Sequence, residues 1–220
     1  TEAKFMKIDI LNSAENHPIR PYLQKWMARQ AQKHDIRLIS KPAEMSTGDI
    51  LFLISCNELI YKKDREKYKK ALVIHASDLP DGRGWSPHIW QVIEGASSIM
   101  VTLFEAADSV DSGDIWKKEI FHLEGHELYQ EINELLFEAE LKLMDWAVAN
   151  FATVKPVPQP KRETRTYPKR SPRDSVIDPH KTIADQFNLL RVCDQDRFPA
   201  FFEFRGQKYS ISLKKLSSGE

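Results

Sequence analysis

Two residues of this sequence, His75 and Asp111, have side chains suited to acid–base chemistry and positions where such chemistry is often found. His75 ends the apolar run ALVIH, and Asp111 lies in the polar stretch AADSVDSGD, which follows a second apolar run. An imidazole can accept or donate a proton near neutral pH, and a carboxylate beside it can fix its tautomer and raise its basicity. Because the two residues are far apart in the chain, spacing alone leaves open whether His75 is only a strand-end residue with satisfied hydrogen bonds.

The loop that follows His75 is rich in turn residues and polar side chains. The stretch HASDLPDGRGWSP contains prolines and glycines, which set the direction of turns. Both a surface turn and an active-site loop fit this composition. Arg83 could bind a phosphate or carboxylate through its planar guanidinium, or it could pair with Asp78 or Asp81 at the surface.

Apolar runs alternate with helical patterns over the first two-thirds of the chain, which predicts an α/β domain. In an open sheet, ligands usually bind beyond the carboxyl ends of the strands. The loops CNELI, HASDLPDGRG and AADSVDSGD are therefore expected to meet at one edge of the sheet. Strands are expected at 5–11, 36–39, 49–55, 71–75, 99–106 and 114–121, and helices at 21–34, 58–70, 86–95 and 126–151.

The composition changes after Phe151. The segment KPVPQPKRETRTYPKRSPRDS is rich in proline and basic residues, which favours a solvated linker first, contact with a nucleotide diphosphate second, and RNA a distant third. A short helix over 181–191 and a β-hairpin of FPAFFEF with KYSISL follow. The predicted organisation is a domain at 1–151, a basic connecting segment at 152–180 and a small helix-plus-hairpin unit at 181–220.

Composition excludes several functional classes. The 220 residues carry 32 basic and 32 acidic side chains, so neither nucleic acid nor an anionic membrane is an expected partner.

Cys56 and Cys193 are too few for a disulfide framework or a cysteine metal site. In HLEGH, His122 and His126 have the spacing of helical metal ligands, but Gly125 between them and the lack of a third ligand favour a strand end and a helix start. No apolar run reaches roughly 20 residues, and TEAKFMKIDIL lacks a signal-peptide pattern, so the expected setting is cytoplasmic.

The stretch HASDLPDGRGWSPHIWQVIEG, followed by MVTLFEAADSVDSGDIW, resembles the formyltransferases that use 10-formyltetrahydrofolate. The matching residues are His75, Leu79-Pro80, Arg83-Gly84 and Asp111-Ser112-Gly113, in the order found in that family, within a region of resemblance from about 50 to 151. The resemblance implies a Rossmann-like formyltransferase domain with a mostly parallel sheet, followed by a small C-terminal helix and β-hairpin. It also implies 10-formyltetrahydrofolate as the formyl donor.

The C-terminal stretch YPKRSPRDSVIDPHKTIADQFNLLRVCDQDRFPAFFEF is similar to a segment of the sugar N-formyltransferases. The stretch GRGWSP resembles a stretch of the formyltransferases that act on intermediates of pseudaminic acid and related nonulosonic acids. The implied acceptor is the primary amine of an amino sugar, nucleotide-linked, in surface glycan biosynthesis. A methionyl-tRNA formyltransferase would need a larger C-terminal barrel than the few residues after Leu213. The phenylalanine-rich hairpin could serve a homodimer interface.

The resemblance also implies roles for individual residues. In that family an Asn and a His donate hydrogen bonds to the oxyanion of a tetrahedral intermediate, and an Asp orients the His and helps to move protons. The His is thus expected either to polarise the formyl oxygen or to carry the proton. His75 and Asp111 match, but Val73 stands where the family has the Asn. Asn57 could supply the missing donor, or it could cap a helix beginning at Glu58. Loss of one oxyanion donor costs about 10²–10³ in rate, so a catalytically silent folate or nucleotide-sugar binding module is the alternative.

Two groups of binding residues follow from the same resemblance. The folate is expected between the CNELI loop and the AADSV segment, and the sugar beside the Ser77–Ser86 loop. Trp85 and Trp90 could stack on a ligand ring or pack in the protein. The expected folate contacts are Cys56, Asn57, Glu58, Leu59, Ile60, Ala107, Asp108, Val110 and Asp111, and the expected sugar contacts are Ser77, Asp78, Arg83, Gly84, Trp85, Ser86, Lys169 and Arg170.

Overall fold

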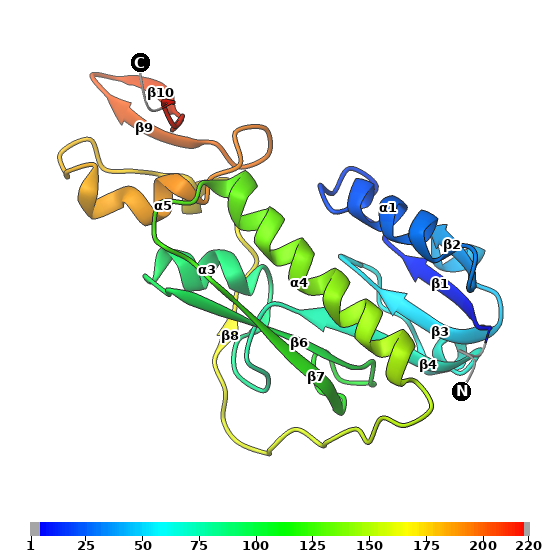
Figure 1. The fold of residues 1–220 in the computed structure, drawn as a ribbon. Coiled ribbons are helices and arrows are strands. Elements are labelled where there is room, and N and C mark those ends of the chain that lie inside the picture. Colours follow the sequence, from blue (N-terminus) through cyan, green and yellow to red (C-terminus); the bar gives the residue numbers. More distant parts are fainter. Residues whose placement is uncertain (1–4, 218–220) are drawn as a thin grey trace.

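The computed structural model describes residues 5–217, built around a six-stranded sheet with the order β2-β1-β3-β4-β6-β7 (Figure 1). The first four of these strands run parallel, and β6 and β7 run antiparallel to their neighbours. The predicted α/β class with a mostly parallel sheet is therefore confirmed. The strands are β1 (Lys7–Leu11), β2 (Asp35–Ile39), β3 (Gly48–Leu53), β4 (Tyr68–His75), β6 (Ser98–Glu105) and β7 (Ile115–His122).

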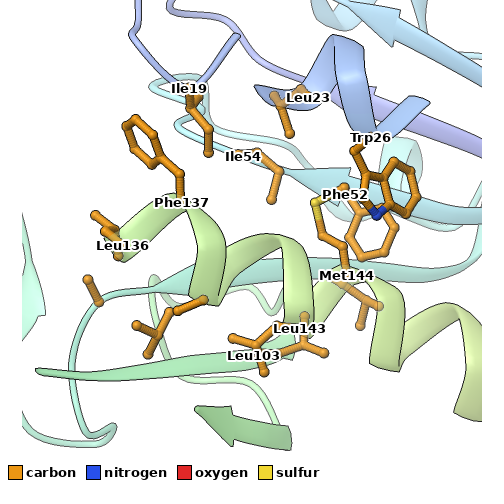
Figure 2. Close-up of a cluster of buried hydrophobic side chains, with 14 of the residues drawn as sticks. Ile19, Leu23, Trp26, Phe52, Ile54, Leu103, Leu136, Phe137, Leu143 and Met144 are labelled. Carbon is orange, nitrogen blue, oxygen red and sulfur yellow. The ribbon is translucent and has the colours of Figure 1, made fainter. Parts of the chain in front are cut away.

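One face of the sheet is covered by α1 (Arg20–Gln30) and the long helix α4 (Tyr129–Asn150), and their apolar faces form the main core (Figure 2). Trp26 meets Phe52 edge to face, with ring centroids 6.0 Å apart, and its indole N–H donates to Asp145 of α4. Each large apolar side chain buried in this way contributes roughly 1.5–3 kcal/mol. None of the helices within residues 5–217 combines the length and apolar character needed to cross a bilayer.

The predicted helix over 58–70 is wrong. The structure has only the four-residue helix α2 (Lys62–Arg65), and β4 already begins at Tyr68. Tyr68 is buried, and its hydroxyl donates to the carboxylate of Asp9 in β1. These tertiary contacts favour the strand, because helical propensity is a weak preference that packing can override.

The expectation that three strand ends meet at one edge of the sheet fails for β6. In the antiparallel pairing with β4, His75 lies opposite Thr102 and Leu72 opposite Glu105, so β6 ends beside the middle of β4. The polar loop after β6 therefore starts away from His75 and turns back toward it. Gly113 allows this turn, because a Cβ there would overlap the carbonyl group of Glu105.

The C-terminal part forms a small unit with its own apolar cluster, centred on Ile177, Leu190, Cys193 and Ala200. The predicted helix is present as a 3₁₀ turn (Ala184–Gln186) followed by α5 (Phe187–Arg191). The predicted hairpin is confirmed as β9 (Ala200–Phe204) and β10 (Gln207–Ile211). Figure 1 shows this hairpin beside α5, apart from the central sheet.

The basic segment after α4, predicted as a solvated linker, is largely exposed but is paired to the rest of the fold at two points. Val157 exchanges two backbone hydrogen bonds with Ile115 at the start of β7. Further along, β8 (Thr166–Tyr167) pairs in parallel with β5 (Arg83–Gly84), which precedes α3 (Pro87–Ile93). Figure 1 shows the segment running in a long arc from the end of α4 to β8. Backbone pairing thus ties the segment to the loop after His75.

Glu140 provides a test of the core, because it is buried in α4 and one of its carboxylate oxygens has no hydrogen-bond partner within the described residues. Burial raises the pKa of Glu140 to about 8. The folded protein therefore keeps the carboxyl neutral, while the unfolded chain loses its proton as the pH passes the ordinary value of 4.5. Glu140→Gln should raise the free energy of unfolding by roughly 3 kcal/mol at pH 7, with the gain vanishing near pH 4.

Urea unfolding at several pH values measures this difference. Glu138→Gln, an exposed position on the same helix, is the matched control and should change little at any pH. An equal effect of the two substitutions would contradict the burial argument.

Candidate active site

His75 and Asp111 lie together at the end of β4. The Nε2 atom of His75 is 3.9 Å from Oδ2 of Asp111, and both side chains are 10% exposed. The His75 ring donates from Nε2 to the backbone carbonyl of Gly82 at 2.8 Å, while Asp111 accepts a hydrogen bond from the backbone N–H of Gly84 at 3.1 Å. A carbonyl can only accept, so the neutral ring carries its proton on Nε2 and leaves Nδ1 as an acceptor.

Two glycines give the loop after β4 the shape that these contacts require. Gly82 and Gly84 have φ values of +73° and +101°, a region that glycine enters without steric cost. A Cβ on Gly84 would overlap the carbonyl oxygen of Tyr167 in β8. The backbone N–H groups of Gly82 and Trp85 donate to the carbonyls of Arg165 and Tyr167, each at 3.0 Å. The loop is therefore held by the basic segment as well as by β4.

Two histidines that the sequence analysis did not select, His17 and His88, also belong to this region. Burial lowers the pKa of His88 to about 3, with further lowering by the charges of His17, His75 and Arg170. Burial likewise lowers the pKa of His17 to about 4, and its Nδ1 accepts the N–H of Ile19. Both rings are therefore neutral at pH 7. A histidine one residue after the proline that opens a helix was the only sequence signal for His88.

The two loops expected to hold the folate are tied together by Arg65. Its guanidinium donates to the carbonyl of Ile60 at 2.7 Å and pairs with the carboxylate of Asp108. Ile60 itself is buried, whereas Leu59 and Val110 are 59% and 68% exposed, so each loop presents one apolar side chain to solvent. Of the remaining expected folate contacts, Cys56 and Ala107 are partly buried, and Glu58 is exposed.

Asn57 does not cap a helix, because α2 begins at Lys62 with Tyr61 at its N-cap position. The backbone N–H of Asn57 donates to Oγ of Ser13 at 2.8 Å. Its side chain is exposed and makes no hydrogen bond to the residues that the structure describes. The structure therefore leaves this amide available without placing it against His75.

The expected sugar contacts divide into residues with internal partners and residues that face solvent. Asp78 pairs with Lys118, and Asp81 with Arg162, so neither forms the surface pair with Arg83 that the sequence allowed. Arg83 instead donates to the side chain of Gln159 at 2.9 Å, and its Nε is buried without a partner within residues 5–217. Ser77 is buried, and Ser86 is exposed.

The two tryptophans differ in exposure and packing. Trp90 stacks parallel to the buried Tyr167 and donates from its indole N–H to the carbonyl of Pro168, which makes it a packing residue. Trp85 is 44% exposed, and Nζ of Lys169 lies 4.8 Å from its ring centre, within cation–π range. Arg170 is partly buried and donates to Oγ of Ser175 at 3.2 Å. Trp85 and Lys169 thus form the accessible edge of this surface.

The histidines of HLEGH are confirmed as a strand end and a residue preceding a helix. His122 ends β7, and His126 lies before α4, where it contacts Glu124 and Lys215. Within residues 5–217, no group of three or more His, Cys, Asp or Glu side chains is arranged to hold a metal ion.

No protein-family model matches the sequence. Among solved structures, the methionyl-tRNA formyltransferase from Clostridium thermocellum superposes with a TM-score of 0.81 at 19% identity, covering 98% of this chain and 96% of that one. A sugar N-formyltransferase from Shewanella sp. superposes with a TM-score of 0.73 at 17% identity, covering 97% and 99%. The chain has the formyltransferase fold.

A third structure with this fold is HypX from Aquifex aeolicus in complex with tetrahydrofolic acid. It has a TM-score of 0.79 and 22% identity over 96% of this chain, which spans 38% of the HypX chain. The match to the Clostridium protein corrects one sequence argument. A chain named as a tRNA enzyme is covered almost completely, so the expected absence of a larger C-terminal barrel does not separate the tRNA enzymes from the sugar enzymes.

The close approach of Gly84 to β8 predicts a specific cost of adding a methyl group there. Gly84→Ala should lower the free energy of unfolding by about 2–4 kcal/mol, because it combines backbone strain with overlap against Tyr167. Gly125→Ala is the matched control, since Gly125 has φ +100° and nothing within 4 Å of the added Cβ. Urea unfolding of both variants isolates the steric part as the difference, and equal losses would show that β5 and β8 are not closely packed.

Proposed function

We propose that this protein is an N-formyltransferase that moves a formyl group from 10-formyltetrahydrofolate to the primary amine of an amino sugar, nucleotide-linked. The observation that carries this proposal is the pair formed by His75 and Asp111, 3.9 Å apart, in a chain with the formyltransferase fold. These are the two residues whose match to the family motif implied a catalytic role.

The reaction forms one bond and breaks another. The amine nitrogen of the sugar attacks the formyl carbon, and a tetrahedral intermediate with an oxyanion results. Its collapse breaks the bond between that carbon and N10 of the folate. The attacking nitrogen loses a proton and N10 gains one, so the products are the N-formyl sugar and tetrahydrofolate.

His75 is suited to carry this proton. Its Nε2–H is engaged by the carbonyl of Gly82, which leaves Nδ1 to accept a proton from the amine and return it to N10. Asp111 lies on the Nε2 side of the ring, where its negative charge stabilises the imidazolium that forms. This geometry favours proton transfer by His75 over donation of a hydrogen bond to the formyl oxygen.

The oxyanion requires a donor other than residue 73. Val73 and His75 are alternate residues of β4 and share one face of the strand, where Val73 packs against an apolar cluster and offers no hydrogen bond. Asn57 is the proposed substitute, because its amide is exposed and uncommitted among the described residues. If no donor reaches the formyl oxygen, the chain is a binding module without turnover.

The proposed folate site lies between the loops joined by Arg65. Leu59 and Val110 would contact the flat pterin and benzoyl groups, and backbone groups of both loops would supply hydrogen bonds. The description of HypX as a complex with tetrahydrofolic acid supports a folate ligand for this fold.

The proposed sugar site lies on the other side of His75, against β5 and β8. Trp85 offers an exposed ring for stacking, and Lys169 and Arg170 add positive charge for a diphosphate. The Shewanella protein, described as a sugar N-formyltransferase, supports this acceptor class. The cytoplasmic setting, the nonulosonic acid pathway and a homodimer stay predictions.

A formyl-transfer assay tests the proposed reaction. Wild-type protein should release tetrahydrofolate when 10-formyltetrahydrofolate is combined with an accepted amino-sugar nucleotide. His75→Ala and Asp111→Asn should each lower kcat by about 10²–10⁴, because proton transfer and its electrostatic support are lost. The controls are His122→Ala and Asp114→Asn, which change exposed residues of the same types.

Folded His75→Ala and Asp111→Asn variants with wild-type rates would refute the site assignment. Folate binding by wild-type protein without turnover on any amino sugar, free or nucleotide-linked, would favour the silent binding module instead. Turnover on methionyl-tRNA alone would favour the tRNA enzyme.

The nucleotide-linked acceptor predicts a charge effect at Lys169. Lys169→Glu should raise KM for the nucleotide-linked sugar about tenfold or more, because it places a carboxylate beside the diphosphate. KM for 10-formyltetrahydrofolate should stay unchanged. Lys161→Glu, an exposed lysine earlier in the same segment, is the matched control. An unchanged acceptor KM in Lys169→Glu would remove this surface from the sugar site.

A further inference from the structure

Gln159 lies in the proline-rich segment between α4 and β8, a position that no sequence motif marks. The segment is anchored just before it, where Val157 pairs with Ile115. From there the side chain of Gln159 reaches the loop that carries Asp111. It is partly buried between this loop and the loop after β4.

Every hydrogen-bonding group of the Gln159 amide is used. Nε2 donates one hydrogen bond to the carbonyl of Asp111 and one to the carbonyl of Gly113, both at 2.9 Å. Oε1 accepts a hydrogen bond from Nη2 of Arg83, also at 2.9 Å. Only this orientation of the amide fits, because exchanging its oxygen and nitrogen would place oxygen against two carbonyls.

The contact to Asp111 holds an unfavourable backbone conformation. Asp111 has φ +54°, in the left-handed region, which Asp tolerates better than most residues with a side chain but still at a cost of about 1 kcal/mol. The conformation is nevertheless the one in which the Asp111 carboxylate accepts the Gly84 N–H and lies beside His75. Two hydrogen bonds from Gln159 to this turn help to maintain it.

The contact to Arg83 closes a ring of hydrogen bonds around the site. His75 bonds to Gly82, Arg83 bonds to Gln159, Gln159 bonds to Asp111, and Asp111 bonds to Gly84. Because Gly82, Arg83 and Gly84 are consecutive, the backbone connects these contacts and closes the ring. Gln159 belongs to neither loop, and its side chain contacts both the loop after β4 at Arg83 and the loop that carries Asp111.

We infer that Gln159 is a positioning residue for the formyl-transfer reaction, fixing Asp111 and Arg83 relative to His75. This inference rests on the proposed function for its effect on rate. Its structural part concerns the placement of the Asp111 carboxylate, which can be measured without substrate.

Gln159→Glu is the decisive variant, because it keeps the shape and the oxygen that contacts Arg83 but replaces the donor to the Asp111 turn by a second oxygen. We expect kcat to fall about 10- to 100-fold with both KM values within about threefold of wild type. Gln159→Ala should also lower kcat if the loss of the amide donor, rather than the negative charge of Glu, causes the fall. Gln24→Glu, an exposed position on α1, is the charge-matched control.

Amide hydrogen exchange, followed residue by residue by NMR, provides the readout without activity. The Gly84 N–H donates to the Asp111 carboxylate, so its protection should fall about tenfold or more in Gln159→Glu. The Trp85 N–H donates to Tyr167 in the same small sheet and should keep its protection. This pair of amides separates a displaced Asp111 from local unfolding of β5 and β8.

The outcomes are distinct. Wild-type kcat and wild-type Gly84 protection in Gln159→Glu would overturn the inference, as would equal loss of protection at Gly84 and Trp85, which would indicate a general structural role. If the wild-type protein transfers no formyl group, the proposed function fails, and the exchange of Gly84 alone decides whether Gln159 positions Asp111.

Discussion

The parallel pairing of β5 with β8 is the contact on which the rest of the candidate site depends. It joins a loop in the middle of the chain to a basic segment that lies well beyond the long helix α4. Through it, the carbonyl of Gly82 faces His75 and the N–H of Gly84 faces Asp111. The pairing also places Lys169 against Trp85. One short backbone ladder therefore positions both the His75–Asp111 pair and the surface beside it.

This dependence explains which parts of the molecule the sequence could predict. Buried strands such as β3 and β4 show as apolar runs, and the hairpin of β9 and β10 shows as two runs around a glycine, because burial and turn chemistry act locally. The prediction of a helix at Tyr68 is wrong, since its strand conformation comes from pairing with Gly48 of β3 and a contact with Asp9, both distant in the chain. The direction of β6 was missed for the same reason, because strand order and direction depend on partners that local patterns do not contain.

The sequence was sufficient to select His75 and Asp111 as candidate site residues, but not to find the residue that connects the loops around them. His75 and Asp111 could be chosen from residue type, loop composition and family resemblance. Gln159 could not, because its function lies in three hydrogen bonds to groups that are distant in sequence, two of them backbone carbonyls. A glutamine between two prolines in a basic stretch is typical of an exposed linker. Only the fold shows that this stretch borders the site.

Because β6 is antiparallel to β4, the loop after β6 must adopt an unfavourable backbone conformation at Asp111, and the ring of hydrogen bonds stabilises that conformation. A parallel strand would have delivered Asp111 directly to the edge where β4 ends. Because β6 ends beside the middle of β4, its loop must turn back, with Gly113 pressed against the end of β6 and Asp111 in a left-handed conformation. A strained conformation of this kind persists only when the surrounding structure holds it. The segment after α4 supplies that support, so the basic, proline-rich composition that suggested a linker belongs to a strap that completes the site.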